Sequence, residues 1–236
     1  MQIFHLQVLG EHKGKLHAEE AHHCVKVLRH AVGDAIHTID GEGRYFPAII
    51  EAIQKDGVLL QLGDANNGWG ESPFQLAIGI SPLAKKDRFE WFLEKSVELG
   101  IDHITPILCK RTGPGRLPRQ DRMEKILLAA TKQSKRSQLP HLSTPIPFES
   151  YVKQTSGKLK MVAWCESHEP LQGYSTAIKD AISIDLLIGP EGDFTENEVT
   201  LAIGNGFHPV SLGENRLRSE TAGIYLLGAL KTYLAY

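Results

Sequence analysis

The chain has 236 residues, of which 42% are hydrophobic and 23% are charged, and its formal net charge is −2 at pH 7. This length allows one large domain or two modest ones, and the apolar fraction is ordinary for a soluble globular protein. The slightly acidic balance excludes a uniformly basic nucleic-acid binder, although a local basic patch remains compatible with it.

The sequence also indicates the cellular compartment in which the chain is expected. No apolar run approaches the roughly 20 residues of a membrane span, and residues 1–5 lack the basic start and long apolar core of a signal peptide. The three cysteines, Cys24, Cys109 and Cys165, are far apart and form no CxxC pair. Neither a disulfide framework nor a zinc ribbon is predicted, and a reducing cytoplasm is the expected location.

The first 70 residues predict a compact β-barrel with one short helix. Phe4, Leu6 and Val8 alternate as one face of a strand. Pro47 has no N–H, so it predicts an edge or a bulge in the strand that contains it. The other expected elements are a helix over 16–30, strands over 35–39, 44–53 and 58–62, and a tight turn at Asp40-Gly41.

The stretch over residues 66–70 is polar and rich in glycine, which predicts a linker. We therefore expect one domain over 1–70 and a second over 71–236. The predicted helix of the first domain carries His17, His22, His23 and His30. A metal site is one interpretation, but without regular ligand spacing we expect histidines that face solvent or a binding partner and no metal.

From residue 74 onwards, predicted strands and helices alternate. Such a pattern is typical of an α/β fold with a parallel sheet and right-handed crossovers. Asp87 is predicted to cap the first helix of this region, and Gly100 to end it as the residue after the C-cap. The further elements are strands over 74–80, 101–108 and 158–164, and helices over 123–137, 151–156 and 174–181.

Residues 110–136 form the most basic part of the chain. They contain nine Lys or Arg residues against two acidic ones, a local net charge of +7. A solvated helix face is the simple interpretation of this segment. Because its Gly- and Pro-rich start and its helix share one sign of charge, contact with nucleic-acid phosphates is favoured.

Two strand–glycine–helix units follow near the C-terminus. The first has a strand over 184–188, then Gly189, Pro190 and Gly192, and a capping box formed by Thr195 and Glu198. The second has a strand over 207–212, then Gly213, and a last helix capped by Ser219 that runs to about Tyr236. The carboxyl edge of a parallel sheet is where α/β folds bind ligands. Two ordinary turns that happen to contain glycine remain an alternative.

The common nucleotide-binding and hydrolase motifs are absent from the sequence. No G-x-G-x-x-G follows a strand, and the segment around Gly10 and Gly14-Lys15 is one residue short of a P-loop and lacks its Ser or Thr. No G-x-S-x-G elbow exists. The sequence therefore lacks the required parts of a dehydrogenase, an NTPase or a serine hydrolase.

The two late units resemble signature motifs of the SPOUT superfamily of RNA methyltransferases, and most of all the 16S ribosomal RNA uridine-N3 methyltransferases (the RsmE family). That family carries Ile-Gly-Pro-Glu-Gly-Gly-Phe and Leu-Gly-x-Arg-Ile-Leu-Arg-x-Glu-Thr-Ala, and the corresponding stretches here are residues 188–194 and 212–222. The similarity extends to residues 87–91, 95–101, 27–29, 33–34 and 40–45. Two departures stand out, because Asp193 replaces a glycine and Asn215-Arg216 replaces Arg-Ile.

The resemblance implies an α/β SPOUT-type parallel sheet with a C-terminal trefoil knot, preceded by a PUA-like β-barrel domain that binds RNA. It also implies a homodimer that uses S-adenosylmethionine to methylate N3 of one uridine in 16S ribosomal RNA of the small ribosomal subunit. The alternatives are a non-catalytic RNA-binding or ribosome-assembly protein that keeps the fold, and a methyltransferase for another RNA base.

The resemblance assigns residues to these roles. Arg218 is expected to hold the uracil anion or a phosphate, and Glu220 either serves as a base or complements the helix dipole. The expected cofactor-binding residues are Cys165, Ile188, Gly189, Gly192, Leu212, Gly213 and Leu217. The expected RNA-binding residues are Arg29, Arg111, Arg116 and Arg136. Replacing Arg111, Arg116 and Arg136 is expected to weaken RNA binding without changing donor binding.

Overall fold

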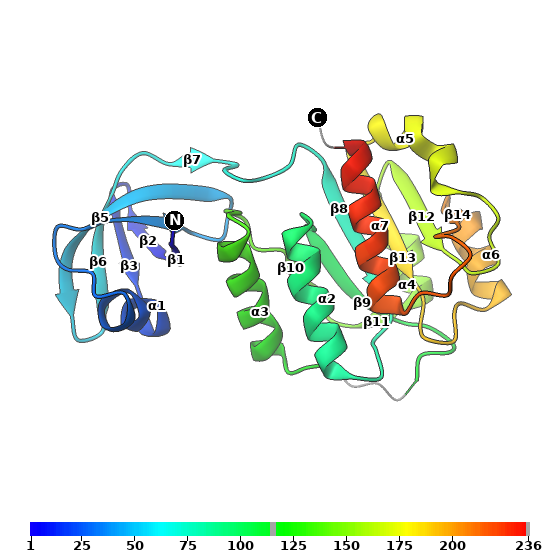
Figure 1. Ribbon diagram of the computed structural model, residues 1–236, viewed down its shortest axis with the longest axis horizontal. Coiled ribbons are helices and arrows are strands. Elements are labelled where there is room, and N and C mark those ends of the chain that lie inside the picture. The colour runs from blue at the N-terminus through cyan, green and yellow to red at the C-terminus, as the bar shows by residue number, and fades with distance from the viewer. Residues whose placement is uncertain (114–116, 235–236) are drawn as a thin grey trace. The chain divides into compact units, whose positions relative to one another are not determined.

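The structure is a computed structural model that describes residues 1–113 and 117–234 (Figure 1). The chain forms two compact units. Unit 1 comprises Met1–Ser72 and Leu128–Leu139, and unit 2 comprises Pro73–Leu127 and Pro140–Tyr236. The helix α3 (Gln120–Gln133) contributes residues to both units. The domain boundary expected near residue 70 therefore stays a prediction.

Unit 1 contains a curled sheet with strand order β1-β4-β5-β6-β3-β2, and β7 pairs with β5. The strands at the two ends of this path, β1 and β2, are separated by Leu6 alone, so the sheet curls around a core that includes Phe4, Phe46 and Leu60. β1 runs parallel to β4, whereas β4 and β5 are antiparallel. The strands are β1 (Ile3–His5), β2 (Gln7–Gly10), β3 (Lys13–Leu16), β4 (Ala35–Ile39), β5 (Arg44–Gln54), β6 (Gly57–Leu62) and β7 (Asn66–Asn67).

Two strand predictions for unit 1 hold in part. Phe4 and Val8 belong to different strands, with Leu6 between them, but all three residues face the core of this unit as expected. Pro47 lies in the central strand β5 and not at an edge, and this strand does contain a bulge, between Ile50 and Ala52. The missing N–H of Pro47 is tolerated because the β6 ladder ends at Ala48, and the Pro47 carbonyl still accepts the N–H of Gly63 at 2.8 Å.

The predicted helix over 16–30 is shorter and changes its geometry. It consists of α1 (Ala18–His22) followed by a π-helical turn over His23–Val27. This turn buries Cys24 in the core of unit 1. Arg29 then takes a left-handed backbone conformation with φ +62°, which ends the helix.

Unit 2 contains a parallel sheet in the order β10-β9-β8-β13-β12-β14, and β11 pairs with β9. The predicted parallel α/β architecture is thus confirmed for this unit. The strands are β8 (Gln75–Ile80), β9 (His103–Leu108), β10 (His141–Leu142), β11 (Ile146–Pro147), β12 (Leu159–Ala163), β13 (Ser183–Ile188) and β14 (His208–Val210). β14 is shorter than the strand predicted over 207–212.

Helices cover both faces of this sheet (Figure 1). α2 and α7 lie side by side on one face, where Gly223 lets α7 approach within contact of the Phe92 ring. α4 and α6 pack on the other face with Phe148, Val199 and Phe207. The helices are α2 (Lys86–Glu98), α4 (Phe148–Gln154), the 3-10 turn η2 (Leu171–Tyr174), α5 (Ser175–Lys179), α6 (Glu196–Gly204) and α7 (Ser219–Leu234). The last two predicted positions of α7 fall outside the described residues.

The ends of α2 test two local predictions. Its N-cap is Lys85, which makes no side-chain cap, so the prediction of Asp87 as the cap is wrong. Asp87 instead lies in the first turn, where its charge complements the helix dipole. Gly100 follows the C-cap Leu99 with φ +89°, which confirms its predicted role.

The strand register aligns three strand ends at one edge of the unit 2 sheet. Ala163 at the end of β12 pairs with Ile188 at the end of β13, and Ile188 pairs with Ile80 at the end of β8. The loops that follow these strands therefore emerge together at the carboxyl edge. Along the described chain, no helix has the length and apolar character needed to cross a membrane.

Candidate functional site

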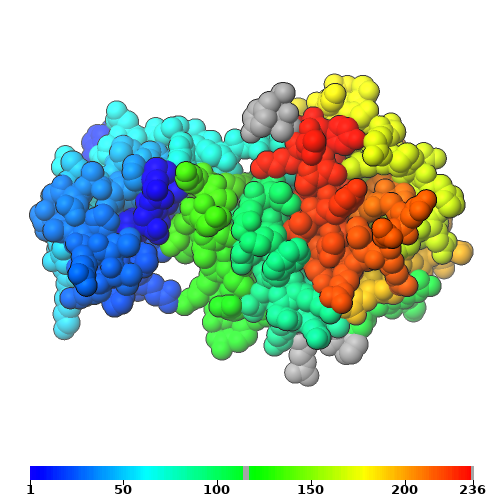
Figure 2. Space-filling view, viewed as in Figure 1, coloured from blue at the N-terminus to red at the C-terminus, as the bar shows by residue number. Residues whose placement is uncertain are grey.

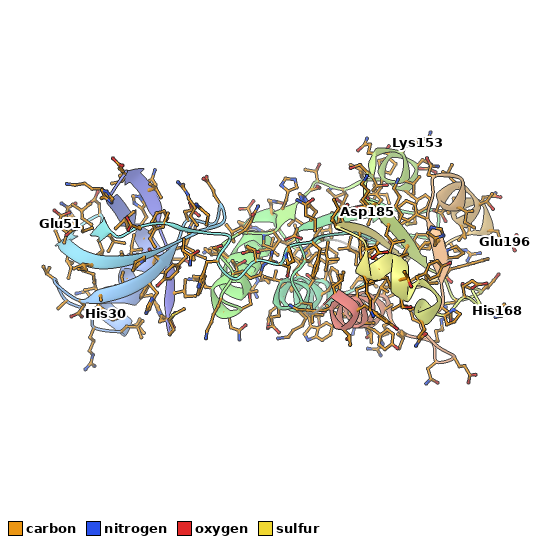
Figure 3. All side chains as sticks on the ribbon, turned by 90° about the horizontal axis from the view of Figure 1, so that it is seen from above. His30, Glu51, Lys153, His168, Asp185 and Glu196 are labelled. Carbon is orange, nitrogen blue, oxygen red and sulfur yellow. The ribbon has the colours of Figure 1, made fainter. Side chains whose placement is uncertain are left out.

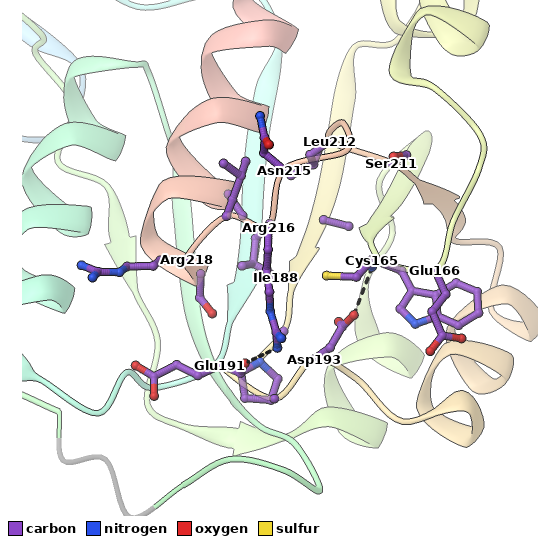
Figure 4. A pocket seen from close by; sticks show the side chains of 18 of the residues that line it. Cys165, Glu166, Ile188, Glu191, Asp193, Ser211, Leu212, Asn215, Arg216 and Arg218 are labelled. Atoms are coloured by element: carbon purple, nitrogen blue, oxygen red, sulfur yellow. Dashed lines mark hydrogen bonds between the residues drawn. The ribbon is translucent and has the colours of Figure 1, made fainter.

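A pocket of about 750 Å³ lies at this carboxyl edge, within unit 2 (Figure 4). It is formed by the loops that follow β12, β13 and β14. In the space-filling view, the segment before α7 (orange) lies at the surface beside the helix itself (red) (Figure 2). The lining residues are Arg88, Arg111, Ala163 to Glu166, Ile188 to Asp193, Ser211 to Ser219 and Ala222.

The pocket brings together all the predicted cofactor-binding residues and Arg218. Cys165 comes from the loop after β12, Ile188 to Gly192 from the loop after β13, and Leu212 to Leu217 from the loop after β14. Of the predicted RNA-binding residues, Arg111 lines the same pocket. Arg29 and Arg136 belong to unit 1, and Arg116 lies outside the described residues. The roles of these residues stay predictions.

The loop over residues 189–194, called here the first loop, is closely packed. A Cβ at Gly189 would lie 3.1 Å from Cδ2 and 3.2 Å from the backbone N of Phe194, so a larger residue here would force Phe194 to shift. The N–H of Asp193 donates to the Pro190 carbonyl at 2.9 Å and closes a tight turn. The predicted capping box is confirmed, because Thr195 and Glu198 bind each other's backbone N–H at the start of α6.

Asp193 connects the first loop to the end of β12. Its Oδ2 accepts the backbone N–H of Cys165 at 3.0 Å (Figure 4), and its Oδ1 accepts the N–H of Phe194 at 2.8 Å. Its backbone has φ +62°, a conformation that glycine adopts freely and that Asp and Asn tolerate better than other residues. The replacement of glycine noted in the sequence thus occurs at a left-handed position.

Arg111 holds the first loop from another side. Its Nη1 donates to the carbonyls of Gly192 at 2.9 Å and Phe194 at 3.2 Å. The neighbouring backbone N–H of Lys110 donates to Glu198 at 2.7 Å. The guanidinium of Arg111 therefore supports the pocket, a function that its place in a basic segment did not indicate.

The loop over residues 211–218, called here the second loop, is more open. Gly213 to Arg216 are exposed, and Gly213 has φ +110° with no atom within 4 Å of the place that a Cβ would take. Arg216 reaches across the pocket, and its Nη2 donates to the Glu191 carbonyl at 3.2 Å. In Figure 4, Arg218 points away from Cys165 and Asp193.

A small cluster of charges at the pocket was missed in the sequence. Arg88 of α2 lies 3.4 Å from a carboxylate oxygen of Glu191 and 3.6 Å from Oε1 of Glu220. Glu220 is 6% exposed, and its Oε2 has no hydrogen-bond partner. Arg88 could have been noticed because residues 87–91 carry part of the family resemblance. Its pairing could not have been predicted, because Glu191 and Glu220 lie more than 100 residues further along the chain.

The pocket suits a small molecule that carries both signs of charge. Its lining includes the acidic residues Glu166, Glu191 and Glu214 and the basic residues Arg88 and Arg216. Gly192 and Gly213 let a ligand approach the backbone closely. Partial burial raises the pKa of the Cys165 thiol, and the Asp193 carboxylate acts in the same direction. This thiol is therefore not activated as a nucleophile.

Several cations of the basic segment are already paired. Arg136 is 5% exposed and binds Glu71 at 2.7 Å, within unit 1. Lys132 pairs with Glu20, and Arg122 pairs with Glu90 at 2.9 Å. Arg29 is exposed. The net charge of +7 therefore overstates the charge that this segment offers to a phosphate, and the RNA-binding role of Arg136 stays a prediction.

The histidines of the first helix do not gather with other ligands. Among residues 1–113 and 117–234, no group of three or more His, Cys, Asp or Glu side chains is placed to hold a metal ion. His17 instead contacts Gln7 at 2.7 Å, and His30 contacts Asp34 at 3.2 Å.

Comparisons with known proteins relate this chain to RNA methyltransferases. A family model of RNA methyltransferase domains matches residues 70–231, and a model of the RNA methyltransferase PUA domain matches residues 16–63. Ribosomal RNA small subunit methyltransferase E of Synechocystis is 31% identical over 91% of this chain and 71% of its own length. The Bacillus subtilis protein of the same name is 29% identical over 90% of this chain and 87% of its own length.

A solved structure extends this likeness to three dimensions. Ribosomal RNA small subunit methyltransferase E from Neisseria gonorrhoeae, bound to S-adenosylmethionine, superposes with a TM-score of 0.84 at 26% identity. The match covers 98% of this chain and 97% of that one. The chain therefore belongs to the ribosomal RNA small subunit methyltransferase E family of RNA methyltransferases.

Proposed function

We propose that this protein transfers the methyl group of S-adenosylmethionine to N3 of one uridine in 16S ribosomal RNA of the small ribosomal subunit. The observation that carries the proposal is the single pocket into which both glycine-containing loops open. Membership of the ribosomal RNA small subunit methyltransferase E family supports the activity, and the relative solved with S-adenosylmethionine supports the donor.

The residues of the pocket fit this donor. A volume of about 750 Å³ accommodates a molecule of its size, and the open space beside Gly213 leaves room against the backbone. The donor carries an ammonium, a carboxylate and a sulfonium, and the pocket supplies charges of both signs. We assign its adenine and ribose to backbone groups near Ile188, Gly189, Leu212 and Leu217.

The donor supplies an electrophilic methyl group, and the protein must deal with the N3 proton of uracil. That N–H is a weak acid, so attack requires a base or a cation that stabilises the uracil anion. Arg218 is exposed at the pocket and is assigned the anion or a neighbouring phosphate. Glu220 has a buried oxygen without a partner and is the candidate base, and complementing the dipole of α7 is its alternative role.

RNA recognition is assigned to the N-terminal PUA-like domain, proposed over 1–70, and to the basic segment. Arg29 and Arg111 are the exposed candidates for phosphate contact within this proposal. The methyltransferase domain is proposed over 71–236, with a trefoil knot in which the last helix passes behind the first loop. The proposed location is the cytoplasm.

We further propose that the protein acts as a homodimer through its methyltransferase domain. Tyr225 of α7 is 52% exposed and Trp91 of α2 is 43% exposed, which leaves apolar surface on two neighbouring helices. Leu227 of the same helix is fully buried in the core and does not belong to this surface. Sedimentation at micromolar concentration tests the dimer, and a fully active monomer would contradict it.

The function is tested by mass mapping of 16S ribosomal RNA nucleosides from cells with and without the gene. Loss of one N3-methyluridine, restored by the intact gene and not by a Gly213→Val variant, is the expected result. An unchanged nucleoside map, together with retained binding of the donor, would indicate another RNA substrate. An unchanged map without donor binding would indicate a non-catalytic RNA-binding protein.

A further inference from the structure

Asp193 is unusual for its backbone and its contacts. Four non-glycine residues among those described have a positive φ, namely Ala18, Arg29, Lys135 and Asp193. Asp193 alone among these four belongs to unit 2. It also lines the pocket, at the turn between β13 and α6. Left-handed strain at a non-glycine residue persists only where surrounding interactions hold it.

The side chain of Asp193 provides such interactions. One carboxylate oxygen accepts the N–H of Phe194 inside the first loop, and the other accepts the N–H of Cys165 after β12. Bonds from a carboxylate to backbone N–H groups are charge-assisted and stronger than neutral ones. The same side chain therefore compensates its own backbone strain and joins two strand ends that border the pocket.

The hydrogen bond between Asp193 and Cys165 lies where the width of the pocket has to be fixed. Cys165 follows β12 and Gly192 follows β13, and both line the pocket. The ladder between these strands ends at Ala163 and Ile188, so it no longer holds the chains together beyond that point. The bond between Asp193 and Cys165 continues the restraint past the last strand pair.

We propose that Asp193 is a positioning residue of the methyl-donor pocket. Its carboxylate fixes the separation between the first loop and the end of β12 before the donor binds. The inference rests on the proposed function, since it assigns this pocket to the donor. It assigns Asp193 no contact with the donor and no proton transfer.

The test compares Asp193→Gly and Asp193→Asn with the intact protein. Glycine removes the backbone strain and both side-chain bonds. Asparagine tolerates the left-handed backbone and keeps one acceptor oxygen in place of two. Calorimetric titration with S-adenosylmethionine should show an affinity about tenfold lower for Asp193→Gly, and a loss of only about threefold for Asp193→Asn.

Hydrogen exchange of the Cys165 amide provides a readout that is independent of activity. This exchange should accelerate in Asp193→Gly in the absence of donor. The matched control is Asp102→Asn, because Asp102 Oδ2 accepts the Leu76 N–H at 2.9 Å near the amino end of β8, away from the pocket. That variant should change the free energy of unfolding and leave donor affinity unaltered.

The outcomes separate this inference from the proposed function. If the intact protein binds the donor and Asp193→Gly binds it equally well while Cys165 exchange accelerates, the positioning role is wrong. An Asp193→Asn variant as weak as Asp193→Gly would point to direct recognition of the donor and would also overturn it. An intact protein that does not bind S-adenosylmethionine would overturn the proposed function and this inference together.

Discussion

The two loops that line the pocket differ in how the protein holds them. The first loop is restrained by Asp193 and Arg111 and by the packing of Gly189 against Phe194. The second loop is exposed from Gly213 to Arg216. Within the part of the chain that the structure describes, the backbone N–H groups of Glu214, Asn215 and Arg216 find no protein acceptor.

This difference assigns the two loops different energetic roles. A loop that is already ordered loses little conformational entropy when a ligand binds, whereas an exposed loop must be ordered at that moment. We infer that the first loop presents a preformed half of the donor site and that the second loop closes over it. Substitutions that loosen the first loop should then affect both stability and donor binding, whereas substitutions in the second loop should affect mainly donor binding.

The largest effect is expected from Gly213→Val. A Cβ there meets open pocket space but imposes strain at φ +110° and occupies room that the donor needs. If the strain falls on the bound state, the affinity for S-adenosylmethionine should drop roughly 5- to 150-fold. Calorimetric titration measures this, alongside an RNA gel shift that should change little.

The matched control for this prediction is Gly206→Val. Gly206 also has a positive φ, +87°, and open surroundings, but it lies after α6 and does not line the pocket. It should cost stability without changing donor affinity. Donor binding that survives in a folded Gly213→Val variant would place the cofactor site elsewhere.

Gly189→Ala is expected to lower the stability of the folded protein. Its Cβ would lie 3.1 to 3.2 Å from the ring and backbone of Phe194, so the first loop must shift. The free energy of unfolding should fall by about 1–2 kcal/mol, as for overpacking elsewhere, and urea denaturation measures it. Gly204→Ala, at the end of α6 with nothing within 4 Å, is the control that should not destabilise the protein. An unchanged unfolding midpoint for Gly189→Ala would show that the first loop adapts freely.

Arg111→Ala should weaken donor binding even without RNA. The substitution removes the hydrogen bonds to the carbonyls of Gly192 and Phe194, and a loss of about three- to fivefold in affinity is expected. This revises the expectation from sequence that donor binding is independent of Arg111. Arg119→Ala is the control, since its partner is Asp121 on the exposed start of α3. Equal donor affinity in the two variants would leave Arg111 with an RNA role alone.

The smallest effect concerns Asp185, near the amino end of β13 (Figure 3). Burial raises its pKa above the usual 3.8, although the N–H of Gly157 bonds to its carboxylate. The folded state therefore binds this proton more tightly, and the resulting stability is fully present below about pH 3.8 and is lost as the pH rises through the folded pKa.

Asp185→Asn removes this titration. The free energy of unfolding of the variant should depend less on pH, in the range just above 3.8, than that of the intact protein. Denaturation at a series of pH values checks this, and identical profiles would contradict it. Donor affinity should stay the same, because Asp185 lies at the opposite end of the strand from the pocket.

Local patterns in the sequence predicted much of this fold, and interactions between distant residues explain most of the errors. The capping box of Thr195 and Glu198 and the glycine after α2 were predictable, because each depends on neighbours within a few residues. The restraint by Asp193 was not, since Cys165 lies 28 residues earlier. The pairing of Arg136 with Glu71 could not be predicted for the same reason, because the two residues are 65 positions apart.

The central claim is tested most directly by hydrogen exchange of the intact protein with and without S-adenosylmethionine. Without donor, the amides of Asp193 and Phe194 should already be protected, and those of Glu214 to Arg216 should exchange rapidly. Saturating donor should slow exchange in the second loop strongly, change the first loop little and leave residues 1–63 unaffected. Protection that appears only away from the residues that line the pocket, or a first loop that exchanges as fast as the second before donor is added, would contradict the account.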